Sequence, residues 1–158
     1  MANTQSMTTS FLGELMTATH NFGTAPTRGT GATDTFKAAL YLASATINAA
    51  TTVYSTTGEV TGTNYTAGGI TVTAATAPTA TNSSATAGVA FFTPSASFVY
   101  TTVTLSTAFD CVLVYNSTQS NKAVSVHTFG SQTITAGTFT LTMPANTTTT
   151  ALLRLATT

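Results

Sequence analysis

The chain has 158 residues, and its four Lys plus Arg balance four Asp plus Glu, so the formal net charge is zero at pH 7. Only 5% of the residues are charged, against about 25% in an average globular protein, whereas 42% are hydrophobic. So few cations exclude a nucleic-acid-binding arm and a polybasic membrane patch, because both need several cations on one face. The hydrophobic content excludes a disordered chain.

The chain is expected to divide into an N-terminal arm with a linker, residues 1–35, and a β-sandwich domain over residues 36–158. The linker is residues 22–34, where Gly, Pro and Thr are frequent and favour a loop. Beyond residue 35 the hydrophobic period becomes two and the β-branched content rises, which is typical of strands.

The arm is predicted to contain one short helix over residues 10–20. Four side chains recur there at a spacing that places them on one face of a helix: Leu12, Leu15, Met16 and Thr19. Gly13 lowers the helix propensity of this segment by about 1 kcal/mol relative to Ala.

Seven segments of the body read as strands. Five of them alternate apolar residues with Thr, Ser or other polar residues: 36–42, 70–74, 123–129, 138–143 and 150–155. The other two, 98–105 and 108–115, are apolar on both faces, which suits central strands. Ser106 and Thr107 separate them by the length of a hairpin loop.

Strands at this spacing without a long helix among them indicate an all-β fold, an antiparallel β-sandwich or jelly-roll-like body. Residues 75–87 are rich in Thr, Ala and Ser and are expected to form a surface loop or a low-complexity insertion. Residues 62–69 are rich in Gly and lead into a strand, so they are interpreted as a turn, not as a phosphate-binding loop, which needs a following helix.

The scarcity of charge bears on assembly. Exposed sheet edges are usually protected by Lys, Pro or inward-facing charges, and this chain has only Lys37 and Lys122 as lysines. We therefore expect edges and apolar patches to be covered by further copies of the chain or by a larger lattice. The alternative is that the dense Thr and Ser hydroxyls suffice for solubility.

No arrangement of residues predicts catalysis, a cofactor or a metal site. His127 is expected to be an exposed strand residue, and His20 to end the helix of the arm, where a cation suits the helix dipole. The four carboxylates, Glu14, Asp34, Glu59 and Asp110, show no ligand spacing. The chain is therefore not expected to be an enzyme.

Two residues of the apolar segment 108–115 have alternative interpretations. Asp110 either accepts hydrogen bonds from a turn at a strand end or pairs with Lys37 or Arg154 inside the protein. Cys111 alternates with apolar residues and is expected to fill space in the core instead of acting as a nucleophile.

Several segments resemble, in this order, a family of tailed-bacteriophage virion structural proteins. They are ELMTATHNF (14–22), TDTFKAALY (33–41), GEVTGTNYTAGG (58–69), AFDCVLVYN (108–116), FGS (129–131) and GTFTL (137–141). The resemblance implies a capsid decoration, or cement, protein that is made in the host cytoplasm and binds the outer surface of the head. Its implied partners are the major capsid protein and copies of itself, with a trimer as the guessed oligomer.

In such a protein the arm has one of two roles. It docks on a neighbouring capsid subunit or decoration copy, or it covers the core of its own body. The residues that would make either contact are Phe11, Leu12, Leu15 and Phe22.

An alternative function is a tail, neck or fibre component that binds a host surface or a carbohydrate. Sugar sites usually present exposed aromatic side chains, and the candidates for these are Tyr54, Tyr65 and Tyr100. This alternative rests on analogy of fold alone.

Overall fold

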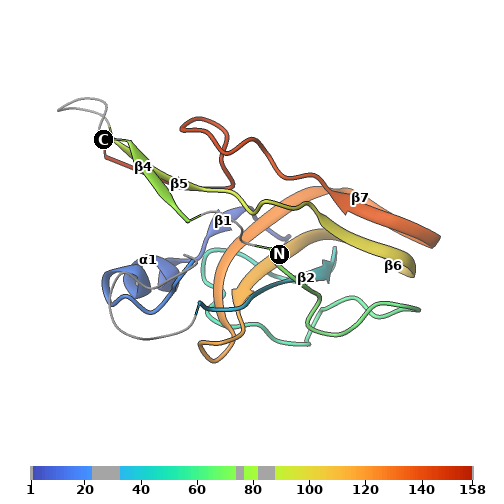
Figure 1. The fold of residues 1–158 in the computed structure, drawn as a ribbon. Helices are drawn as coiled ribbons and strands as arrows, with labels where there is room; N and C mark the ends of the chain where they lie inside the picture. Colours follow the sequence, from blue (N-terminus) through green and yellow to red (C-terminus); the bar gives the residue numbers. More distant parts are fainter. Residues whose placement is uncertain (1, 23–32, 74–76, 82–87, 158) are drawn as a thin grey trace. The chain divides into compact units, whose positions relative to one another are not determined.

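A computed structural model describes residues 2–22, 33–73, 77–81 and 88–157 of the chain (Figure 1). The fold is the expected all-β class, of the antiparallel sandwich type, with one short helix near the N-terminus. The elements in chain order are β1 (Ser6–Met7), α1 (Thr9–Met16), β2 (Phe36–Leu42), β3 (Ile70–Thr71), β4 (Thr79–Thr81), β5 (Val89–Phe92), β6 (Phe98–Asn116), β7 (Lys122–Leu141) and β8 (Leu153–Ala156).

The described residues fall into two compact units. The first unit comprises residues 2–20, 34–72 and 98–140, and the second comprises residues 21–22, 33, 73, 77–81, 88–97 and 141–157. The expected division into an arm and a body at residue 35 depends on the linker, whose residues 23–32 lie outside the described part, and it stays a prediction.

The first unit contains a five-stranded sheet in the order β1-β7-β6-β2-β3. β2 pairs antiparallel with β6, from Phe36 opposite Asn116 to Tyr41 opposite Cys111. Both faces of β2 and of the half of β6 that pairs with it, residues 109–116, are buried, which explains their continuous apolar sequence. One face packs into a core cluster with part of the loop that follows β2: Ala39, Tyr41, Ile47, Cys111, Leu113, Tyr115, Ala123 and Val126.

The predicted hairpin at Ser106 and Thr107 is wrong. These two residues lie in the middle of β6, which is one continuous strand. The segment 123–129 and residues 138–141 of the segment 138–143 likewise belong to the single strand β7, which ends at Leu141. The actual hairpin lies between β6 and β7, and the two long strands run side by side in Figure 1 (yellow and orange). Ser106 and Thr107 lack the Gly or Asn that a two-residue turn prefers, so the chain continues through them as strand.

The β6–β7 ribbon bends sharply. The rings of Phe129 and Phe139 lie 5.0 Å apart, centroid to centroid, whereas ten residues of straight strand span about 33 Å. Phe109 contacts both rings edge to face, at 5.9 and 5.2 Å. The aromatic side chains therefore fill the inner side of the bend. Left-handed backbone at Thr102 and Ala136 marks local irregularities in the two strands.

The second unit contains a three-stranded antiparallel sheet in the order β4-β5-β8. The segment predicted over residues 150–155 becomes β8, shifted toward the C-terminus. The prediction of a loop over residues 75–87 is wrong for Thr79–Thr81, which forms β4 opposite β5. Thr has a high strand propensity, and its pairing partner decides the structure here.

The helix is shorter than predicted, and a different face of it is buried. α1 ends at Met16, before the expected end at residue 20, and its buried residue is Phe11. The strand expected over residues 70–74 is also shorter, because only Ile70 and Thr71 pair with β2; residue 74 lies outside the described part.

Candidate functional site

The N-terminal residues dock on the sheet of their own unit. Ser6 and Met7 pair antiparallel with Val126 and Ser125 of β7. Thr8, which is fully buried, continues this contact, because its backbone N–H donates to the carbonyl oxygen of Val124 at 3.0 Å. This segment therefore adds a short fifth strand at one edge of the sheet.

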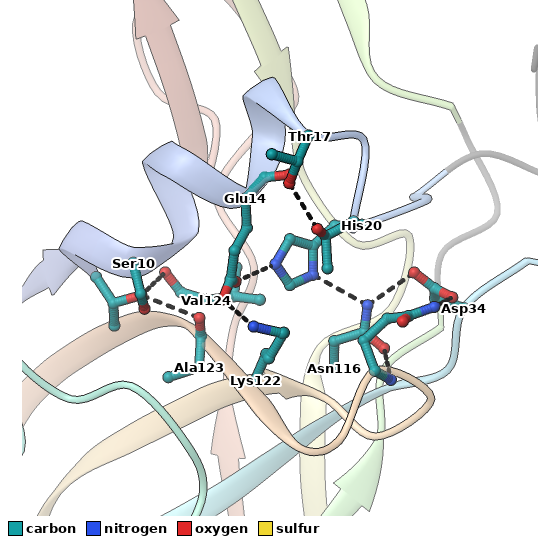
Figure 2. Close-up of polar contacts among 12 residues, drawn as sticks. Ser10, Glu14, Thr17, His20, Asp34, Asn116, Lys122, Ala123 and Val124 are labelled. Atoms are coloured by element: carbon teal, nitrogen blue, oxygen red, sulfur yellow. Dashed lines mark hydrogen bonds and ion pairs between the residues drawn. The ribbon is translucent and has the colours of Figure 1, made fainter.

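A polar network holds α1 against the ends of β6 and β7 (Figure 2). Glu14 of α1 accepts from the Lys122 ammonium through Oε1 and from the His20 ring through Oε2, the latter at 2.7 Å. Burial alone would raise the pKa of Glu14, but the hydrogen bonds from Lys122 and His20 outweigh it and hold the pKa below its ordinary value. Glu14 is therefore a carboxylate at neutral pH.

Asn116, at the end of β6, fixes the other side of the network. Its Oδ1 accepts from the backbone N–H groups of Thr118 and Gln119, so its Nδ2 must point toward the Asp34 carboxylate, at 2.7 Å, and toward His20 Nδ1, at 3.0 Å. Nδ1 of His20 is thus an acceptor, and Nε2 carries the proton that is donated to Glu14. The buried imidazole is the neutral Nε2–H tautomer.

The prediction that His20 ends the helix is wrong, because α1 stops at Met16. The His20 side chain is completely buried, and its ring lies 5.1 Å from that of Phe11 and 6.3 Å from that of Phe36. Each group of this network has a partner within the described part of the protein. The arrangement ties α1 to the β6–β7 hairpin and is a positioning device.

The four residues proposed for the arm's contact have different environments. Phe11 is 2% exposed and packs against His20, and Phe22, in the second unit, packs against Phe92 with ring centroids 5.1 Å apart. Leu15 is half-buried. Leu12, by contrast, is 42% exposed, and Met16, one helical turn later, is 90% exposed. The side of α1 that remains available to a partner is thus formed by Leu12 and Met16.

A second polar cluster surrounds Glu59, which is 6% exposed. Its carboxylate accepts from the hydroxyls of Tyr54 and Tyr65, at 2.6 and 2.8 Å, and from the backbone N–H of Gly68, at 2.7 Å. The Tyr115 hydroxyl donates to the carbonyl oxygen of the same Gly68 at 2.8 Å. Sequence reasoning missed this site although the donors to Glu59 lie within nine residues of it, because two tyrosines and a backbone N–H form no recognisable motif.

The turn over residues 62–69, as predicted, leads into β3. It needs glycine at Gly69, which has a φ of +71° and whose Cβ, if present, would lie 1.8 Å from the carbonyl oxygen of Ala38. Tyr65 and Gly68 of the same turn supply two of the hydrogen bonds to Glu59. The Glu59 cluster is therefore built by the turn.

The tyrosines considered for carbohydrate binding are engaged inside the protein. Tyr100 is 3% exposed and donates its hydroxyl to the Ala38 carbonyl oxygen, and the hydroxyls of Tyr54 and Tyr65 bind Glu59. Tyr54 stacks on Tyr115 with centroids 4.5 Å apart. The expectation of an exposed aromatic platform at Tyr100 is wrong, because its ring fills the space between β6 and β2.

The remaining residues singled out by sequence lie as follows. Asp110 accepts from the Asn3 side chain at 2.6 Å, and neither Lys37 nor Arg154 is its partner in the described structure. His127 is half-buried, with its ring 2.9 Å from the Ser125 hydroxyl, so the prediction of an exposed histidine is wrong.

Cys111 is fully buried in the core cluster, as predicted. Burial, with the Asp110 charge beside it, raises the pKa of its thiol to about 12. The group is a neutral thiol at neutral pH and is a poor nucleophile.

The described residues contain no group of three or more His, Cys, Asp or Glu side chains that could hold a metal ion. Among the same residues, no helix has the length and apolar character required to cross a membrane.

The outer edge of β7 is open beyond Val126. β1 occupies this edge only at Ser125 and Val126, and no other described strand pairs with it between residues 127 and 141. Residues 123–153 contain no Lys, Arg, Asp or Glu, and the residues from Gly130 to Thr133 are all exposed. We call residues 127–141 the β7 edge. It has neither charge nor proline, the usual protection of an edge strand.

Neither the family models, nor the curated proteins, nor the solved structures contain a match to this chain.

Proposed function

We propose that the chain is a virion structural protein of a tailed bacteriophage, a capsid decoration protein that binds the outside of the head as a homo-oligomer and stabilises the shell. The observation that carries this proposal is the unprotected β7 edge on a body whose residues are only 5% charged. Such an edge templates pairing with another chain and favours a protein that works in an assembly. The resemblance of the segments above supplies the kind of assembly.

The arm contributes to partner binding through one face of α1. Phe11 covers the chain's own core, which fits the second of the two roles considered for the arm, whereas Leu12 and Met16 remain exposed. We assign this face to the contact with the major capsid protein. Repeated over a symmetric lattice, many such weak contacts reinforce one another.

The test is binding to heads that lack the decoration protein. Deletion of the N-terminal residues is a poor variant, because they form β1 and carry the Glu14 contacts. The double variant Leu12→Ser with Met16→Ser removes the exposed face and leaves Phe11 in place. Val53→Ser, a change at a 48% exposed apolar residue elsewhere in the first unit, is the matched control.

The wild-type chain and the control are expected to bind purified heads in co-sedimentation, and the double variant is expected to bind at least roughly tenfold more weakly, as for the loss of two apolar contacts. Absence of binding by the wild type to heads contradicts the proposal. Binding to tails alone would favour the alternative function, a tail component. Unchanged binding by the double variant would contradict the role of α1 in the contact.

A further inference from the structure

We propose that the β7 edge pairs antiparallel with the β7 edge of a second copy, about a two-fold axis at Ile134. This inference deepens the proposed function, and rests on it for its setting, by naming the surface through which copies of the chain associate. The pair of copies would form a continuous sheet in the order β6-β7-β7-β6.

The first support is the hydrogen-bonding capacity of this edge. The carbonyl oxygen of Val124 points to the outer side of β7, because it accepts from Thr8 of the N-terminal segment. β1 pairs no further than Val126, so along the β7 edge the outward backbone groups have no strand beside them among the described residues. A further strand would continue the ladder that β1 begins.

The second support is the sequence of the edge, which nearly reads the same in both directions. Counting outward from Ile134, the residues that would face each other across the two copies are similar in kind or small. The pairs are Thr133–Thr135, Gln132–Ala136, Ser131–Gly137, Gly130–Thr138, Phe129–Phe139 and Thr128–Thr140. Antiparallel pairing of the edge with itself brings Thr against Thr and Phe against Phe, which are favourable cross-strand pairs.

The third support is the bend of the ribbon. The close approach of Phe129 and Phe139 shows that β7 bends toward one face of the sheet. A two-fold axis perpendicular to the sheet keeps the direction of this bend, so both copies curve toward the same side. The two strands can therefore stay paired on either side of the irregularity at Ala136, whose backbone N–H donates to the Thr104 hydroxyl of β6 at 3.0 Å and not to the outer edge.

The chemistry of the edge favours a copy of the chain over a different partner. With no ionic group between residues 123 and 153, the edge offers a charged partner nothing to pair with. Self-pairing also brings no like charges together. A contact about a two-fold axis gives an even number of copies, which differs from the trimer guessed from the resemblance.

The test uses Thr133 and Thr135, which are both exposed and would face each other across the axis. The double variant Thr133→Lys with Thr135→Lys sets Lys against Lys twice. The double variant Thr133→Glu with Thr135→Lys carries as many new charges but sets Glu against Lys twice. Thr71→Lys, at an exposed position of β3 on the opposite edge of the sheet, is the control.

Mass is measured by sedimentation equilibrium of the full chain over a range of concentrations, with circular dichroism to confirm folding. The wild type and Thr71→Lys are expected to dimerise alike. The Lys–Lys variant is expected to raise the dimer dissociation constant roughly tenfold or more. The Glu–Lys variant is expected to have a dissociation constant near that of the wild type.

A wild type that stays monomeric overturns the inference, as does a dimer that the Lys–Lys variant leaves intact. Equal weakening by both double variants overturns the register about Ile134. Head binding is measured separately: self-association without head binding contradicts the proposed function and leaves this inference standing, and head binding by a monomer does the reverse.

Discussion

Tyr100 and Val114 belong to the same strand, β6, and both engage Ala38 of β2. Val114 is the antiparallel pairing partner of Ala38, and Tyr100 donates its hydroxyl to the Ala38 carbonyl oxygen at 2.7 Å. The first half of β6 therefore folds back over β2, which its second half pairs with. This return covers one face of β2, and the loop that follows β2 contributes to the core cluster on the other.

The hydrogen bond from Tyr100 is expected to stabilise this return. Tyr100→Phe leaves the buried Ala38 carbonyl oxygen without the hydroxyl and should lower the free energy of unfolding by about 1–2 kcal/mol. Thr101→Val, at the exposed neighbouring residue, should change it by less than about 0.5 kcal/mol. Urea unfolding followed by circular dichroism measures both, and equal effects would contradict the assignment.

Asn116 is expected to be the most sensitive polar residue of the first unit. Asn116→Ala leaves Asp34, His20 and two backbone N–H groups each short of a partner, and should cost about 2–4 kcal/mol of the free energy of unfolding. Gln119→Ala, which removes one half-buried donor to Asp34, should cost less than about 1 kcal/mol. Amide exchange in α1 should rise in the first variant and stay near the wild-type rate in the second.

The tyrosines around Glu59 are expected to make the fold sensitive to alkali. Burial, then the Glu59 charge, raises the pKa of Tyr115 to about 12, and burial together with Glu59 raises the pKa of Tyr54, Tyr65 and Tyr100 further. The neutral phenols are therefore favoured in the folded state. Their contribution to stability is complete below the unfolded pKa of about 10 and is lost as the pH rises toward 12.

Tyrosinate absorbance and circular dichroism, recorded together against pH, test this expectation. Tyrosinate should appear only as the sheet signal is lost. Ionisation of these phenols near pH 10 with the sheet intact would contradict the buried placement of their hydroxyls.

His127 is expected to contribute to acid sensitivity. Burial lowers the pKa of its ring to about 4, below the unfolded value of about 6.5. The unfolded chain therefore takes up a proton first, so the contribution of His127 is complete above pH 6.5 and is lost as the pH falls toward 4. The melting temperature of the wild type should fall across this range more steeply than that of His127→Gln; parallel curves would show that His127 is not responsible.

The strands were predicted well from the sequence where the hydrophobic pattern alone determines the structure. Phe36–Leu42 has the predicted bounds, and the apolar segment around Cys111 is central in the sheet. The prediction of a hairpin at Ser106 was wrong because β6 bends there. The bend interrupts the apolar pattern of the strand in the same way as a turn between two strands would. The Glu59 cluster was missed although its donors lie within nine residues of it, because Tyr54, Tyr65 and the backbone of Gly68 form no recognisable motif until the chain folds around the carboxylate.

Because Cys111 is buried, its reaction with a thiol reagent reports the opening of the first unit. Cys111 is the single cysteine of the chain, is 0% exposed and lies in a central strand. A thiol reagent can therefore react with its sulfur only when β2 and β6 separate. The rate of labelling therefore measures how often the first unit opens as a whole, and it requires no engineered probe. Comparison of that rate in free chains and in the proposed assembly would show how far association suppresses such opening.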